Sequence, residues 1–195
     1  MKALTAAANS KFLLWLILAA PMALWCFQYL SGRIFYGEFL HITGQFSAQL
    51  LILTMALTAL RLAWPRERWT SWLLQRRRYF GVATFAYAVP HLVAYLVKVS
   101  SLDRVLSDAA EAGMWTGWLA MLLFLPLAIT SNNSSVRRLG KRWKRLHRLV
   151  YPAAVLTFLH WVLVAFDPTI GLIHAGALAA IEAYRLWKTQ AMRKN

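Results

Sequence analysis

The chain has 195 residues, 59% of them hydrophobic and 14% aromatic, and its mean hydropathy is +0.47. Apolar runs of about twenty residues recur along it, which indicates a polytopic membrane protein and excludes an ordinary soluble domain. The net charge of +15 could indicate a nucleic-acid partner, but the Lys and Arg residues cluster in short segments between the apolar runs, as membrane topology requires. We therefore expect membrane lipids around the chain and no nucleic acid. The single cysteine, Cys26, can form neither an intramolecular disulfide nor a CxxC redox pair.

The apolar runs predict an all-α fold, a bundle of six transmembrane helices in a single domain over residues 1–195. The expected helices cover about residues 12–30, 39–64, 79–99, 114–129, 146–166 and 170–187, and the first is expected to be retained rather than cleaved as a signal peptide. The connecting segments are too short for a second folded domain, and Ser131–Ser135 is interpreted as a polar loop. Prolines that can kink a helix by removing a backbone hydrogen bond are expected inside four of the spans, at Pro21, Pro90, Pro126 and Pro152.

The basic residues predict the orientation of the bundle. When alternate connections are assigned to alternate sides, nineteen of the 22 Lys and Arg residues fall on one side, and the other side keeps only Arg33, Lys98 and Arg104. Because the basic side of a membrane protein faces the cytoplasm, we expect both termini to be cytoplasmic, in a bacterial inner membrane. The acidic segment from Asp103 to Glu111 is then expected on the periplasmic side.

Two histidines in the third and fifth predicted helices share one depth. His91 lies twelve residues, or about 18 Å, after Tyr79, and His160 lies fourteen residues, or about 21 Å, after Leu146. Two neutral imidazoles at one level inside a bundle are what a low-spin b-type haem requires, with one nitrogen on each side of the iron. Three alternatives remain open from the residues alone: a transition-metal site, a proton relay, or two histidines that only hydrogen-bond within the bundle.

Two segments carry a family resemblance: RRRYFGVATFAYAVPHLVAYL (76–96) and PLAITSNNSSVRRLGKRWKRLHRLVYPAAVLTFLHW (126–161). They resemble the ferric-reductase-like transmembrane superfamily, and within it the haem-binding inner-membrane subunits that serve a periplasmic, molybdenum-containing methionine sulfoxide reductase. The resemblance implies a b-type haem and a flavin mononucleotide (FMN). It also implies that electrons come from the quinone pool or a cytoplasmic flavin reductase and pass outward to that reductase.

The chain departs from this family at one expected ligand. Other members place two histidines on each of two helices, but Arg77 and Arg78 stand where the second histidine of the third helix is expected. His147 therefore lacks a partner, and we expect one haem, held by His91 and His160. His147 is interpreted either as a polar residue at the membrane interface or as a contact to a second cofactor, haem or FMN. Cationic side chains nearby could neutralise a flavin phosphate or haem propionates, or could simply anchor the topology; they are Arg77, Arg78, Arg142 and Arg145.

Three further ionisable residues receive smaller roles. His41 and His174 are expected near the periplasmic ends of their helices, where they would be solvated or would support the site indirectly. Glu182 is expected to pair with Arg185, three residues later on the same helix, and a quinone or proton contact is the alternative.

The sequence thus predicts an electron-transfer subunit rather than a catalytic one. We expect it to relay electrons from the quinone pool or a cytoplasmic flavin reductase to a periplasmic methionine sulfoxide reductase. Two alternatives are a stand-alone ferric or quinone reductase of the same superfamily, and a non-redox metal or proton transporter that uses the membrane histidines.

Overall fold

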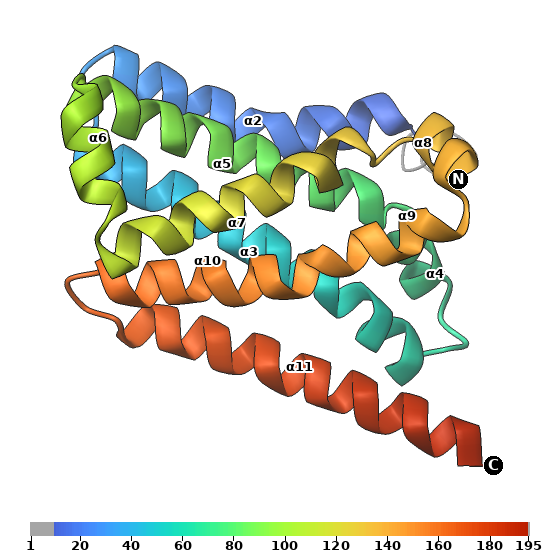
Figure 1. Cartoon of the computed structure of the whole chain (residues 1–195). Coiled ribbons are helices and arrows are strands. Elements are labelled where there is room, and N and C mark those ends of the chain that lie inside the picture. Colours follow the sequence, from blue (N-terminus) through green and yellow to red (C-terminus); the bar gives the residue numbers. More distant parts are fainter. Residues whose placement is uncertain (1–9, 195) are drawn as a thin grey trace.

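The computed structural model describes residues 10–194, and within that range it contains helices and connecting turns but no strand. Six long helices lie side by side (Figure 1). Their bounds are α2 (Lys11–Leu30), α3 (Tyr36–Ala63), α5 (Arg77–Val99), α7 (Ala112–Ile129), α10 (Val150–Val164) and α11 (Thr169–Lys194). The predicted all-α membrane bundle is confirmed, although the residues before Ser10, which begin the predicted retained segment, lie outside the described range.

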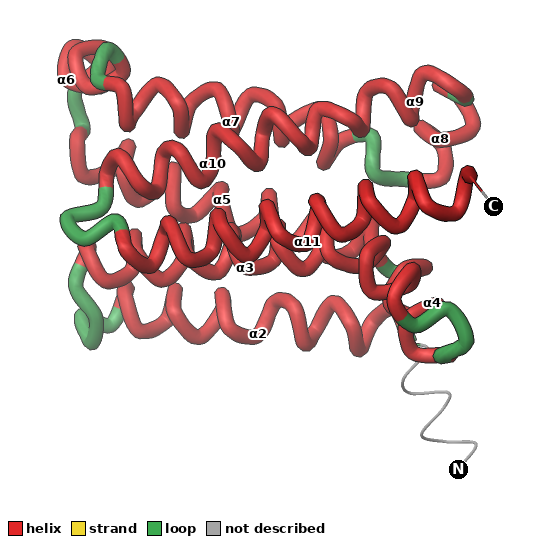
Figure 2. The backbone as a smooth tube through the Cα atoms, turned by 90° about the horizontal axis from the view of Figure 1, so that it is seen from below, coloured by secondary structure: helices red, strands yellow, loops and turns green. Residues whose placement is uncertain are grey.

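Five helical segments are long and apolar enough to cross a membrane: α2, α3, α5, α7 and the continuous stretch Lys141–Val164 that ends with α10. The chain is therefore a multi-pass membrane protein. Helix α11 has 26 residues but is not among the five, and it carries the charged residues Glu182 and Arg185. It runs along α3 from one end of the bundle to the other (Figure 2). The sixth crossing stays a prediction.

The expected helix over about 146–166 is recovered within the helical stretch Lys141–Val164, which includes a 3-10 turn, η1 (His147–Leu149), before α10 and ends two residues early, at Val164. Pro152 lies in the first turn of α10. The other three prolines do lie inside helices, at Pro21, Pro90 and Pro126.

Short helices occupy the two ends of the bundle. One end, here called the α6 end, carries α6 (Leu102–Ala109), whereas α4 (Arg68–Gln75), α8 (Asn133–Leu139) and α9 (Lys141–Leu146) lie at the opposite end, here called the basic end (Figures 1 and 2). The interpretation of Ser131–Ser135 as a loop holds for Ser131 and Asn132 but is wrong from Asn133 on, where α8 begins. The Asn132 side chain accepts a hydrogen bond from the Ser135 backbone N–H at 2.8 Å and so begins α8.

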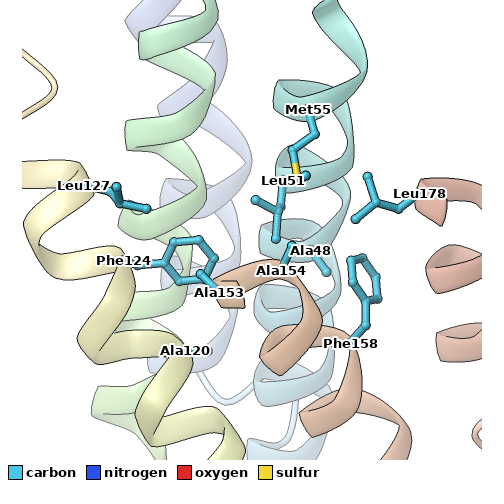
Figure 3. Close-up of a cluster of buried hydrophobic side chains, with 10 residues drawn as sticks. All are labelled: Ala48, Leu51, Met55, Ala120, Phe124, Leu127, Ala153, Ala154, Phe158 and Leu178. Atoms are coloured by element: carbon cyan, nitrogen blue, oxygen red, sulfur yellow. The ribbon is translucent and has the colours of Figure 1, made fainter. Parts of the chain in front are cut away.

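Two clusters of buried side chains hold the bundle together. One joins α2, α3 and α5, and the other joins α3, α7, α10 and α11 around Phe124 and Phe158 (Figure 3). The second cluster contains four alanines, which let the helix backbones approach closely: Ala48, Ala120, Ala153 and Ala154. This packing fixes α5 and α10, the helices that carry the candidate site, relative to α3 and α7.

Candidate functional site

A cavity of about 350 Å³ lies among α3, α5, α7 and α10, toward the α6 end. Its walls include both histidines that the sequence predicts to work as a pair, so it is called the histidine cavity below. Much of its wall is apolar, with Ala48, Leu92, Ala120, Met121 and Phe124. The cavity is thus a largely apolar, pre-formed space of the size that organic ligands and cofactors occupy.

His91 on α5 and His160 on α10 face each other in this cavity. Their ring centroids are 6.3 Å apart and the ring planes are inclined by 87°. The two residues are 69 positions apart in the sequence, and the expectation that they share a depth matches their position in the fold. The structure therefore brings together the two residues that the sequence predicts as a pair.

Each of these imidazoles is fixed by a backbone carbonyl. The Nδ1 atom of His91 lies 2.9 Å from the Leu40 oxygen, and the Nδ1 atom of His160 lies 2.7 Å from the Gly113 oxygen. Because a carbonyl oxygen only accepts hydrogen bonds, both Nδ1 atoms carry the proton and donate it. In the neutral rings Nε2 then carries the free lone pair, which is the arrangement that metal-ligating histidines adopt.

Two glycines make room for these rings. A Cβ atom on Gly44 would lie 2.9 Å from the His91 ring, and one on Gly117 would lie 2.7 Å from Nδ1 of His160. Sequence reasoning missed both positions. One of them carries a signal, because Gly113 and Gly117 form a G-x-x-x-G pattern on α7, which is typical of helices that approach one another closely in membranes.

The donor set of the histidine cavity suits a planar cofactor better than a bare metal ion. Within residues 10–194 no group of three or more His, Cys, Asp or Glu side chains could hold a metal ion. The cavity instead offers two opposed imidazoles in an apolar wall, which is the ligand set of a low-spin haem.

A second cavity, of about 250 Å³, lies closer to the basic end and is called the basic cavity. Four cationic side chains and one histidine contribute to its wall: Arg77, Arg78, Lys144, Arg148 and His147. Phe124 lines both cavities. The other two arginines considered from the sequence, Arg142 and Arg145, do not line this cavity.

His147 presents its ring in the opposite way to His91 and His160. Its Nε2 atom lies 3.0 Å from the Thr130 hydroxyl, whose own proton is donated to the Pro126 oxygen at 2.6 Å. A hydroxyl has one proton, so His147 must donate from Nε2. The His147 ring is also stacked on Trp143 with centroids 3.9 Å apart. Nε2 of His147 is thus hydrogen-bonded to Thr130 in this structure, whereas in His91 and His160 the hydrogen-bonded nitrogen is Nδ1.

The two arginines that replace an expected histidine begin α5 and reach toward the basic cavity. Arg78 donates to the Asn133 side chain at 2.7 Å, and Arg77 donates to Thr58 at 3.4 Å. Both are half-buried. A guanidinium group stays protonated and cannot bind iron, but it can bind carboxylates and phosphates.

The smaller roles predicted from the sequence are placed as follows. Glu182 and Arg185 form the expected ion pair, with 2.6 Å between Oε2 and Nη2. His174 does not line the histidine cavity; its Nε2 atom lies 3.4 Å from the amide nitrogen of Gln49. His41 is exposed and lines the mouth of the histidine cavity.

Comparisons with known proteins connect this arrangement to a family. The family described as "Ferric reductase like transmembrane component" matches residues 43–158. Several curated relatives are named "Protein-methionine-sulfoxide reductase heme-binding subunit MsrQ". The protein from Xanthomonas campestris pv. campestris (strain B100) is 37% identical over 163 residues, covering 82% of this chain and 73% of the relative. The one from Rhodospirillum rubrum is 42% identical over 157 residues, covering 78% and 74%. No solved structure matches the chain.

Proposed function

The chain belongs to the ferric-reductase-like transmembrane family, and within it to the MsrQ group, and from this we propose that it is a membrane b-type cytochrome that relays electrons to a methionine sulfoxide reductase. The observation that carries the proposal is the facing pair of His91 and His160, each held through Nδ1 by a backbone carbonyl. The chain is proposed to be the electron-transfer subunit, and the reduction of the sulfoxide is assigned to a separate catalytic subunit.

The residues of the histidine cavity fit a haem. His91 and His160 would hold its iron through Nε2, Leu40 and Gly113 would fix the ring tautomers, and Gly44 and Gly117 would leave space for the rings. The apolar wall would exclude water from the cofactor. When bound, a haem supplies one-electron chemistry, and the protein's task is to hold it and tune its environment.

We propose FMN for the basic cavity. The cluster of Arg77, Arg78, Lys144 and Arg148 suits an anionic phosphate, and His147 does not present Nε2 as a ligand for a second iron. On this proposal His147 and the two arginines of α5 border the flavin, and the chain holds one haem. An FMN in the basic cavity and a haem in the histidine cavity would share Phe124 as a wall residue.

The distribution of charge suggests how the bundle is oriented in the membrane, and this orientation gives each end of the bundle an electron-transfer partner. The basic end would face the cytoplasm, where the quinone pool or a cytoplasmic flavin reductase supplies electrons. The α6 end, close to the histidine cavity, would face the periplasm and a molybdenum-containing catalytic subunit. In intact cells, a reporter that is active only in the cytoplasm should then be active when it is fused after Asn195. An inactive reporter in this fusion would contradict the orientation and the direction of electron flow.

The relay is tested by reoxidation of the reduced chain. The purified chain is reduced with a limiting amount of dithionite, and its absorbance is followed after addition of methionine sulfoxide, the catalytic subunit, or both. Reoxidation should need both additions. If ferric iron or a quinone analogue reoxidised the chain rapidly, and the catalytic subunit with sulfoxide did not, the stand-alone reductase would be the better account.

A further inference from the structure

One face of α3 carries two parallel rows of residues at the histidine cavity. Leu40 and Gly44 form the first row: the carbonyl of Leu40 holds the His91 ring, and Gly44 gives that ring space. His41 and Gln45 follow each of them by one residue and line the same cavity. Residues four apart are neighbours on a helix surface, so His41 and Gln45 lie together, beside the row that positions His91.

His41 and Gln45 have no assigned partner. Neither side chain forms a hydrogen bond or an ion pair in residues 10–194, although Gln45 is half-buried. No buried side-chain nitrogen or oxygen lacks a partner within the described residues, so the Gln45 amide is accessible to water and stays available to a ligand. Apart from His91 and His160, His41 is also the single side chain lining this cavity that can carry a positive charge. The pair therefore offers hydrogen-bond donors and a potential cation to whatever fills the cavity.

The other polar part of the wall is unsuited to an anion. Tyr95 donates its hydroxyl proton to the Asp108 carboxylate at 2.8 Å, so its donor is already used. The negative charge of Asp108 would repel a second carboxylate beside it. Trp118 and Trp161 also line the cavity, but an indole offers one N–H and no charge. By elimination, the His41 side of the cavity is the one that can receive an anionic group.

We propose that His41 and Gln45 form the subsite that binds the propionate carboxylates of the haem, an inference that rests on the proposed haem-binding function. A haem has an apolar macrocycle and two carboxylates at one edge. The apolar wall suits the macrocycle. The carboxylates then lie at the mouth, where exposed His41 reaches water and Gln45 donates from its amide. His41 thus binds the cofactor without binding its iron.

The chain contains a matched control for this proposal. Gln49 lies one turn further along α3 and contacts His174 of α11, and neither residue lines the histidine cavity. His174→Leu and Gln49→Leu therefore remove the same two residue types near the same end of the bundle. They should leave haem affinity nearly unchanged, because neither side chain lines the cavity; His174 reaches the wall only through Trp161, whose ring centroid is 5.1 Å from its own.

The test compares two porphyrins. The full chain, produced in haem-deficient cells and purified in detergent, is titrated with iron protoporphyrin IX and with its dimethyl ester, whose carboxylates are blocked. The Soret absorbance gives each Kd. His41→Leu and Gln45→Leu should each weaken binding of the free acid by about tenfold, the usual effect of losing one hydrogen bond to a charged group. Binding of the ester should be unchanged, which also shows that the variants are folded.

Three results would overturn the proposal: equal weakening for both porphyrins, no weakening for either, or the same weakening in the His174 and Gln49 controls. A separate outcome bears on the underlying function. If the unmodified chain bound neither porphyrin, the haem site itself would be refuted, and not only the propionate subsite.

Discussion

The two cavities of the bundle use the same kind of residue in opposite ways. In the histidine cavity, His91 and His160 donate from Nδ1 to backbone carbonyls, which leaves Nε2 free. In the basic cavity, His147 donates from Nε2 to Thr130 and stacks on Trp143. The first arrangement leaves two ring nitrogens able to bind a metal, whereas the second fixes a ring beside four cationic side chains. The role of a histidine in a membrane helix therefore depends on which ring nitrogen is hydrogen-bonded, because that decides which nitrogen is left free.

The two cavities also differ in the charge of the side chains that line them. Apart from its histidines, the wall of the histidine cavity carries no cationic side chain, whereas Arg77, Arg78, Lys144 and Arg148 contribute to the basic cavity. A low-charge, apolar wall suits a porphyrin, and a cationic wall suits a phosphate. The departures from the family pattern, at Arg77 and Arg78, thus fall where a different cofactor is proposed.

The largest expected effect separates the cavities by cofactor. His91→Ala or His160→Ala removes one axial ligand and should lower haem affinity by more than about a hundredfold, since loss of a supporting residue alone costs about ten- to a hundredfold. FMN content should not change. Haem and flavin are quantified together with protein in the same purified sample.

The reciprocal variant sharpens this result. His147→Ala should deplete FMN and retain the haem, because His147 borders the basic cavity and offers no Nε2 ligand. If this variant instead lost haem, or if the parent chain contained two haems and no flavin, the assignment of different cofactors to the two cavities would be wrong.

A smaller effect is expected when the space beside a ligand is filled. Gly117→Ala places a Cβ atom 2.7 Å from Nδ1 of His160 and must displace the ring from its carbonyl partner. Haem affinity should fall by about tenfold, comparable to the loss of a supporting hydrogen bond at a metal ligand. Soret titration of the purified variant measures it.

Gly176→Ala is the matched control for this change. Nothing lies within 4 Å of the Cβ atom that it adds to α11. An unchanged haem affinity is expected there. If Gly117→Ala and Gly176→Ala behaved alike, the close packing around His160 would not govern haem binding.

The smallest effect concerns the tautomer of His147. Thr130→Val removes the hydroxyl that accepts from Nε2 and should lower FMN affinity about threefold, the scale of a single neutral hydrogen bond, with haem affinity unchanged. The ring ¹⁵N shifts of selectively labelled histidine should show protonated Nε2 for His147 in the parent and a loss of that preference in the variant. A parent chain with the proton on Nδ1 would contradict the inference from Thr130.

The sequence predicts the features that depend on periodicity and charge. Long apolar runs specify membrane helices, so five of the six expected spans are recovered with bounds shifted by a few residues. The pairing of His91 with His160 was also predictable, because equal depth on two helices follows from a fixed rise per residue. The Glu182 pair with Arg185 follows from their i,i+3 spacing.

The features that were missed depend on contacts between helices. The carbonyls of Leu40 and Gly113 and the space beside Gly44 arise from how α3 and α7 pack on their neighbours, which a single sequence does not encode locally. The tautomer of His147 needs the Thr130 contact, 17 residues away. The helical segment α8 was missed because its Ser and Asn residues are common both in loops and at the starts of helices.

The visible spectrum of the purified chain, recorded before and after dithionite reduction, shows whether His91 and His160 hold a haem. We expect a Soret band that shifts on reduction, a low-spin spectrum, and one haem per chain by pyridine haemochrome assay. His91→Ala and His160→Ala should each lose or convert that spectrum. An absent Soret band in the parent, or an unchanged low-spin spectrum in both variants, would contradict the assignment of His91 and His160 as haem ligands.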